Sequence, residues 1–301
     1  MKEFRHHCRL MGSAFEFIVI AADEQEADIF FKAGKEEVFR IEKLLTEFSP
    51  DSETARINAM EAHKIYTINA EVYSLLERCK KLSEISQGAF DITIGPLKKL
   101  YRFQGEEGVF PKEEELKATL SRTGFQHILL LGNNRIFLEK RGMKISFAAI
   151  GKGYAADRVR KIWKEMELTG GVINASGDLS VMGTRADGSN WQTGIADPGK
   201  ETLLMKVNMP TFSVATSGDY EQFFMYKGEK YSHTLHPKTG LPLKGIRSVS
   251  VFSPSAELSD ALATAVYVMG LEAGKHFIQQ LPGTYCVIAH ENKQVYSNLP
   301  S

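Results

Sequence analysis

The feature that most constrains the fold is a long β-rich stretch in the second half of the chain, from about residue 171 to residue 252. Short apolar or alternating segments follow one another here, separated by glycine, proline or polar turn residues. Because regular helical segments do not alternate with these strands, we predict an α+β fold rather than a doubly wound parallel sheet. The predicted strands lie near 171–175, 178–183, 191–196, 204–208, 212–216, 222–226, 230–235 and 247–252.

Helical periodicity lies on both sides of this stretch. Residues 24–48 and 69–86 carry apolar residues at helical spacing, and Asn69 is placed to cap the second helix. A third helix begins near Lys152, and Gly170-Gly171 is expected to end it. No linker divides the chain, so we expect residues 1–301 to form one large domain with mixed, mostly antiparallel sheets and packed helices. The remaining predictions are helices at 256–269 and 271–280 and strands at 15–22, 127–131, 135–138, 144–147 and 284–289.

Composition excludes several classes of protein. The 37 basic and 37 acidic residues balance, which argues against a nucleic-acid partner. No apolar run approaches the roughly 18 residues of a membrane helix, so we expect no transmembrane segment. The start of the chain has no apolar signal core, which predicts a cytoplasmic protein, or one of the cell envelope if an export leader has been removed. The scattered Cys8, Cys79 and Cys286 predict free thiols and no zinc site.

A glycine-rich turn is the densest unusual segment. Residues 146–157, SFAAIGKGYAAD, bring small residues into a Gly-Lys-Gly turn at the start of a predicted helix. Unpaired N–H groups at a helix N-terminus bind phosphate, and Lys152 would add a positive charge. The spacing matches neither the dinucleotide-binding fingerprint nor the P-loop, so a tight turn with a solvated lysine is an equal alternative.

Three further places offer reactive groups, each with a plainer alternative. His233 lies at the end of a predicted strand, next to a rigid turn, so it is either catalytic or structural. Asp260 and Thr264 lie one helical turn apart and could bind a hard cation such as Mg²⁺, or could cap and pack a helix. Asp91 lies in an apolar stretch, which indicates either a hydrogen-bond hub or a ligand contact.

Taken in chain order, these segments resemble the ApbE family of FAD:protein FMN transferases. The resemblance implies an enzyme that binds FAD in a central cleft, uses Mg²⁺, and transfers FMN to a Thr or Ser hydroxyl of an acceptor flavoprotein with release of AMP. It extends from about Met11 to the C-terminus. The motifs that carry it are MGS from Met11, FSPDSETARIN, GAFDITIGPL, IGKGYAAD, NASGDLSVMG, WQTGIADP, VATSGDYEQ, YSHTLHPKTGLP and SDALATAVYVMG.

The resemblance also implies roles for individual residues. Asp260 and Thr264 match the metal ligands of the family, and Ala149 matches a third ligand that can act only through its backbone carbonyl. His233 matches the catalytic base. If His233 is not the base, the nearby acid Asp219 is our next candidate, independently of the resemblance. The positions that match FAD contacts are Met11, Phe48, Ala89, Phe90, Asp91, Lys152 and Leu235.

Two positions depart from the family pattern. Ser146 stands where an Asp is usual, and its hydroxyl can still form a hydrogen bond, so we include it as a flavin contact. Phe48 stands where many members have Tyr, which keeps stacking and loses a phenol hydrogen bond. Two other functions stay open: an FAD pyrophosphatase that uses water as acceptor, and a non-catalytic flavin-binding protein. The presence of His233, Asp260 and Thr264 argues against the second of these.

Overall fold

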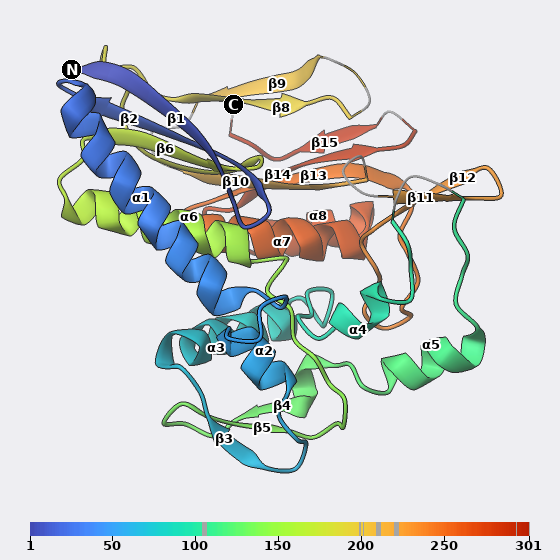
Figure 1. Cartoon of the computed structure of the whole chain (residues 1–301). Helices are drawn as coiled ribbons and strands as arrows, with labels where there is room; N and C mark the ends of the chain where they lie inside the picture. Colours follow the sequence, from blue (N-terminus) through green and yellow to red (C-terminus); the bar gives the residue numbers. More distant parts are fainter. Residues whose placement is uncertain are drawn as a thin grey trace.

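A broad antiparallel sheet forms one side of the molecule (Figure 1). The structure, a computed structural model, describes residues 1–103, 107–198, 200, 202–208, 212–219, 223–292 and 294–300. Among these residues, eight strands form the sheet in the order β1-β2-β6-β7-β10-β13-β14-β15. The strands are β1 Lys2–Leu10, β2 Ser13–Ala21, β6 Gly170–Ala175, β7 Asp178–Gly183, β10 Ser213–Gly218, β13 Ile246–Ser253, β14 Tyr285–His290 and β15 Val295–Ser297.

Both faces of this sheet are buried over its centre. On β2, Phe15, Phe17 and Val19 belong to the main core, while the alternating Ile18 and Ile20 belong to a second cluster on the opposite face. The second cluster lies under the hairpin of β8 (Gln192–Ala196) and β9 (Leu203–Asn208). Helices cover the other face: α1 Glu24–Leu45, α6 Gly151–Glu165, α7 Ala256–Met269 and α8 Leu271–Gln279.

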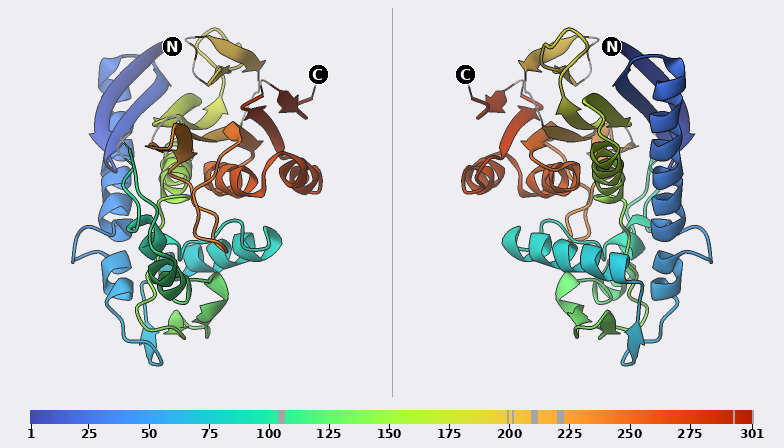
Figure 2. Two further views of the ribbon diagram at one scale, coloured as in Figure 1. Left: turned by 90° about the vertical axis from the view of Figure 1, so that its right-hand side faces the viewer. Right: turned by 90° about the vertical axis from the view of Figure 1, so that its left-hand side faces the viewer.

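A smaller layer lies on the far side of these helices (Figures 1 and 2). Its strands form a three-stranded antiparallel sheet in the order β3-β5-β4, and a separate hairpin of β11 and β12 stands beyond β13. The elements of the smaller layer are α2 Glu53–Asn58, β3 Ile65–Thr67, α3 Ala70–Ile85, α4 Gly95–Lys98, α5 Glu113–Leu120, the 3-10 helix η1 Phe125–His127, β4 Ile128–Leu130 and β5 Arg135–Leu138. The separate hairpin consists of β11 Phe223–Tyr226 and β12 Glu229–Ser232.

The predicted α+β class is confirmed, and several local predictions are confirmed with it. Asn69 caps α3, because its side chain accepts hydrogen bonds from Glu71 and Val72 N–H. Asn133 and Asn134, both with positive φ, connect β4 and β5. Cys8, Cys79 and Cys286 are free thiols. Within the described residues, no helix combines the length and apolar character that crossing a membrane requires.

Two local predictions are wrong. Residues 144–147 do not form a strand: Ile145 N–H donates to the Asn58 side chain, and Ser146 N–H donates to Ile92 O. The glycine pair Gly170-Gly171 does not end the third helix, because α6 ends at Glu165 and Gly170 begins β6. A Cβ at Gly170 would lie 2.0 Å from the carbonyl oxygen of Thr184, so this glycine permits close strand packing. Strand β1, which pairs along all of β2, was not anticipated either.

Candidate functional site

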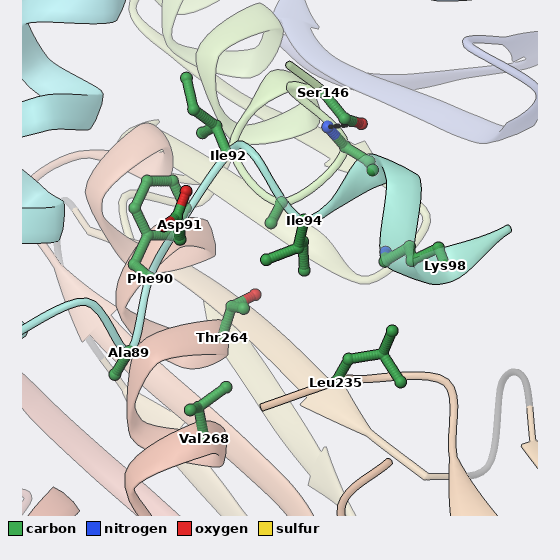
Figure 3. Close-up of a pocket in the computed structure, with 13 residues that line it drawn as sticks. Ala89, Phe90, Asp91, Ile92, Ile94, Lys98, Ser146, Leu235, Thr264 and Val268 are labelled. Atoms are coloured by element: carbon green, nitrogen blue, oxygen red, sulfur yellow. Dashed lines mark hydrogen bonds between the residues drawn. The ribbon is translucent and has the colours of Figure 1, made fainter. Parts of the chain in front are cut away.

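Two adjoining hollows lie between the helix layer and the smaller layer; together we call them the cleft. The open cavity, of about 560 Å³, is lined by residues of the β1–β2 turn, the end of α1 and the start of α6. The narrow pocket, of about 30 Å³, is lined by the 89–98 segment, the loop before α6, Leu235 and α7 (Figure 3). Lys98, Ser146 and Ala148 line both hollows and mark their junction.

The structure brings together eleven of the twelve site residues that the sequence singles out. Asp260 is the exception; it lies behind the cleft, where its carboxylate accepts a hydrogen bond from Gly153 N–H at 3.2 Å. Met11, Phe48, Lys152 and His233 line the open cavity, and Ser146 lies at the junction. Those in the narrow pocket are Ala89, Phe90, Asp91, Ala149, Leu235 and Thr264.

Asp91 is a hydrogen-bond hub within the wall of the narrow pocket. Its Oδ1 accepts from the backbone N–H and the hydroxyl of Thr93, at 2.8 and 2.7 Å, and its Oδ2 accepts from Phe125 N–H at 3.0 Å. Burial raises the pKa of Asp91, and these hydrogen bonds oppose that rise. The carboxylate thus fixes the 89–93 segment, which presents Ala89 and Phe90 to the pocket (Figure 3). A direct contact from Asp91 to FAD stays a prediction.

Helices α6 and α7 cap one another. Ser255 is the N-cap of α7, and Asp157 of α6 accepts from its hydroxyl and from Glu257 N–H, at 2.7 and 2.9 Å. In return, Asp260 of α7 accepts from Gly153 N–H in the first turn of α6. A Cβ at Gly153 would lie 2.2 Å from Ala256 O, so only glycine fits between the two helices. Asp260 is therefore not the cap of its own helix.

The mutual capping leaves fewer backbone N–H groups of the glycine-rich turn available to a ligand. Gly151 N–H donates to Phe147 O at 2.7 Å, and Gly153 N–H donates to Asp260. These two backbone donors bond within the protein, which removes them from the predicted phosphate site. The Lys152 side chain instead lines the open cavity, where its Nζ lies 3.2 Å from Oδ2 of the buried Asp178.

Three oxygen donors near the narrow pocket fit a magnesium ion. Thr264 Oγ1 lies 3.3 Å from Ser217 Oγ. Thr264 lines the narrow pocket (Figure 3), and Ala149 is among the other lining residues. The buried Asp260 precedes Thr264 by one helical turn. No cluster of three or more His, Cys, Asp or Glu side chains suited to a metal occurs in the part of the chain that the structure describes. One carboxylate, a hydroxyl and a backbone carbonyl form a sparse, hard donor set, which suits Mg²⁺ because this ion keeps several waters and binds phosphate oxygens.

A tight hairpin and an exposed ring shape the open cavity. Met11 and Gly12 form the two-residue turn between β1 and β2, with φ of 51° and 71°. This turn brings the Met11 methyl group to the start of α6, 3.6 Å from where a Cβ on Gly151 would lie. The Phe48 side chain is 90% exposed, which makes its ring available for stacking on a planar ligand.

His233 follows β12 and lines the open cavity, half-buried. Its ring meets the ring of Phe103 edge-on, with the ring centroids 6.4 Å apart. The other candidate base, Asp219, lines neither hollow, and its Oδ1 lies 3.4 Å from Nζ of Lys230. The geometry therefore favours His233 over Asp219 as the group that meets a substrate in the cavity.

Lys98 and Glu47 are cleft residues that the sequence reasoning missed. Ser146 Oγ donates to Glu47 Oε1 at 3.1 Å, so a carboxylate lies next to position 146 although residue 146 is not acidic. Lys98 follows the GAFDITIGPL motif directly, and nothing in the sequence distinguishes it from its neighbour Lys99. Only the packing of α4 shows which of the two lysines lines the cleft.

Comparison with known proteins identifies similar sequences across most of the chain. The model of the ApbE family matches residues 11–288. A FAD:protein FMN transferase of Treponema pallidum (strain Nichols) is 30% identical over 285 residues, which cover 87% of this chain and 78% of that protein. One from Klebsiella pneumoniae (strain 342) is 29% identical over 295 residues, which cover 97% of this chain and 90% of that protein.

Solved structures share the fold. The ApbE protein of Thermotoga maritima superposes with a TM-score of 0.90 at 29% identity, covering 98% of this chain and 97% of that one. The apo flavinyl transferase ApbE of Pseudomonas stutzeri superposes with a TM-score of 0.87 at 28% identity, covering 99% and 94% of the two chains.

Proposed function

This chain belongs to the ApbE family, and we propose that it is an FAD:protein FMN transferase that moves FMN from FAD to a Thr or Ser hydroxyl of an acceptor flavoprotein and releases AMP. The observation that most supports this function is the convergence of eleven residues named from the sequence on one cleft. They come from segments as distant as Met11 and Thr264. A shared fold alone would not require such convergence, because one fold can host many functions.

The two hollows suit the two halves of a dinucleotide. The open cavity has the volume and the exposed Phe48 ring for the larger, planar flavin. The narrow pocket has a mostly apolar wall, including Phe90 and Leu235, and its volume of about 30 Å³ must increase before it can receive the second ring system. In this arrangement the pyrophosphate lies near the junction, within reach of the Lys152 side chain.

The transfer step needs a base and an open approach. The acceptor hydroxyl oxygen bonds to the phosphorus on the FMN side, and the bond from this phosphorus to the bridging oxygen breaks, so AMP leaves with that oxygen. A ring nitrogen of neutral His233 takes the hydroxyl proton, which makes a weak nucleophile stronger. His233 lines the open cavity, the side from which a protein acceptor could enter.

Asp260, Thr264 and the Ala149 carbonyl would hold Mg²⁺. Bound Mg²⁺ neutralises charge on phosphoryl oxygens during transfer. The carboxylate of Asp260 is already oriented by Gly153 N–H, and Thr264 by its neighbour Ser217, so the chain positions these donors through α6, α7 and β10.

We also propose that residues 1–301 form one flavin-transferase domain. Phe17 of β2, Val159 of α6, Leu75 of α3 and Ile136 of β5 belong to a single buried cluster. The core thus continues from the large sheet through the helix layer into the smaller layer, without an interface at which two domains would separate.

Mass spectrometry of an acceptor protein tests the function directly. The purified chain is incubated with FAD, Mg²⁺ and a candidate acceptor, and we expect the acceptor to gain one FMN group while AMP appears in equal amount. Calorimetry should also show tighter binding of FAD than of FMN, since the cleft contacts both halves. Free FMN and AMP with an unmodified acceptor would establish a pyrophosphatase instead, and FAD binding without products would establish a flavin carrier.

A further inference from the structure

A second lysine, besides Lys152, lies at the junction between the open cavity and the narrow pocket. Lys98 is the last residue of α4, is half-buried, and lines both hollows. In Figure 3 its terminal nitrogen lies toward the pocket, on the side of Ile94. The next residue, Lys99, is exposed and lines neither hollow.

The packing of α4 explains why Lys98, and not Lys99, faces the cleft. Leu97 is fully buried, in a cluster with Tyr101, Phe224 and Leu235. It also lies close to the chain at Gly240, where a Cβ would be 3.0 Å from Leu97 Cδ2. With Leu97 anchored there and Pro96 in the first turn, the short helix has one orientation, and Lys98 is held at the junction.

The charge of Lys98 is desolvated but not neutralised by a close acid. Among the described residues, no carboxylate lies within ion-pair distance of its ammonium. Burial lowers the pKa of Lys98, and the charge of Glu47 partly opposes this. Glu47 itself is held by the Ser146 hydroxyl. Lys152 differs, because its Nζ lies 3.2 Å from Asp178.

We propose that Lys98 binds the pyrophosphate of FAD at the junction of the two hollows. This inference rests on the proposed function and adds a residue to it. The pyrophosphate is the central part of FAD, with a ring system at either end, and Lys98 lies where the hollows for those ends meet. An ammonium group binds phosphate oxygens by charge-assisted hydrogen bonds, which are strengthened where water is partly excluded.

Binding calorimetry in the presence of EDTA tests this role without turnover. The probes are FAD and riboflavin, which has the same ring without phosphate. For Lys98→Met we expect FAD affinity to fall roughly tenfold to a hundredfold, the usual effect of losing a hydrogen bond to a charged group, and riboflavin affinity to stay unchanged. Lys98→Arg should retain most of the FAD affinity, and Lys99→Met should match the wild type.

The variants should fold, because Met replaces a desolvated ammonium with an apolar group of similar length. Thermal melting checks this, and Lys98→Gln serves as the uncharged variant if Met impairs folding. Unchanged FAD affinity in a folded uncharged variant would overturn the role of Lys98 and leave the proposed function in place. An equal loss for FAD and riboflavin would also overturn it, by locating the contact at the ring. Failure of the wild-type chain to bind FAD both in EDTA and with Mg²⁺ would overturn the proposed function, and this role with it.

Discussion

Charged residues surround helix α6 in two places, one away from the cleft and one at its N-terminus, and their bonding differs between the two. Away from the cleft, Glu37 of α1 accepts hydrogen bonds from Arg40 at 2.8 Å and from Arg158 at 2.9 Å. Glu71 of α3 accepts from Arg40 and from the Tyr154 hydroxyl. We call these five residues the scaffold network. Each of its two acids accepts hydrogen bonds from two other residues, and these bonds link α1, α3 and α6.

At the N-terminus of α6, the charged residues lie in or beside the cleft that we propose for FAD. Lys152 and Asp260 lie in or beside the first turn of α6, and Lys98 of α4 lines the same open cavity as Lys152. The pKa values reflect the contrast: hydrogen bonds from Arg40 hold the pKa of Glu37 and Glu71 below the usual range, whereas burial lowers the pKa of Lys98. The charges of the scaffold network bind one another, whereas Lys98 in the cleft has no carboxylate within ion-pair distance among the described residues.

The largest expected effect comes from Asp260. Asp260→Asn should abolish Mg²⁺-dependent FMN transfer, because the only formal negative charge among the three proposed ligands is lost, while the amide oxygen can still accept from Gly153 N–H. Transfer is measured against Mg²⁺ concentration, with melting as a check on folding. Asp157→Asn, in the reciprocal cap, is the matched control: it should cost about 1 kcal/mol of stability and keep activity. Full activity in Asp260→Asn would remove the metal assignment.

His233→Ala should have the next largest effect. We expect transfer to fall by about 10²–10⁴, the usual contribution of a positioned base, while FAD affinity stays near that of the wild type. The wild-type rate should also fall on acidification, because only the neutral imidazole accepts a proton. His236→Gln is the control, since His236 lies on the same segment but lines neither hollow. If a folded His233→Ala protein transferred FMN at the wild-type rate, the base would have to be sought elsewhere.

Removing a charge from the scaffold network should have a smaller effect, and on stability alone. Glu37→Gln weakens charged hydrogen bonds to Arg40 and Arg158, so we expect a loss of roughly 1–3 kcal/mol in the free energy of unfolding at pH 7. FMN transfer well below the melting temperature should be unchanged. Urea denaturation measures the loss, with the exposed neighbour Glu36→Gln as control.

The pH dependence of that loss has a definite sign. The pKa of Glu37 is lower in the folded chain than its ordinary value of 4.5. Its stabilisation is therefore complete above pH 4.5 and disappears as the pH falls through the lowered value. Wild type and Glu37→Gln should accordingly converge in stability in acid. A constant difference at every pH would show that lost packing, and not charge, destabilises the variant.

Local signals in the sequence were enough to predict many helices and strands, and the resemblance to the family supplied most of the site. Strand β7 at Asp178–Gly183 and helix α7 at Ala256–Met269 have the predicted bounds, because alternation and helical periodicity are strong there. The cleft residues were found through motifs, whose order along the chain carries the resemblance to the family. The bounds of these elements rest on signals within a few neighbouring residues, the range that propensity and periodicity describe, whereas the roles of residues such as Met11 and Ala149 came only from the resemblance.

The contacts between distant segments were decided by the tertiary structure alone. Asp260 looked like a candidate cap of its own helix, yet it caps α6, bonding to a residue 107 positions away. Gly170 looked like a helix stop and instead leaves room for the carbonyl group of Thr184, which directly follows the paired strand β7. Lys98 and Lys99 are equivalent in sequence, and the burial of Leu97 determines which one lines the cleft. The composition and pattern of a chain specify which residues are buried and which polar groups need a hydrogen-bond partner. The partner itself is determined only when the layers pack, because all buried polar groups must then form hydrogen bonds in one common arrangement.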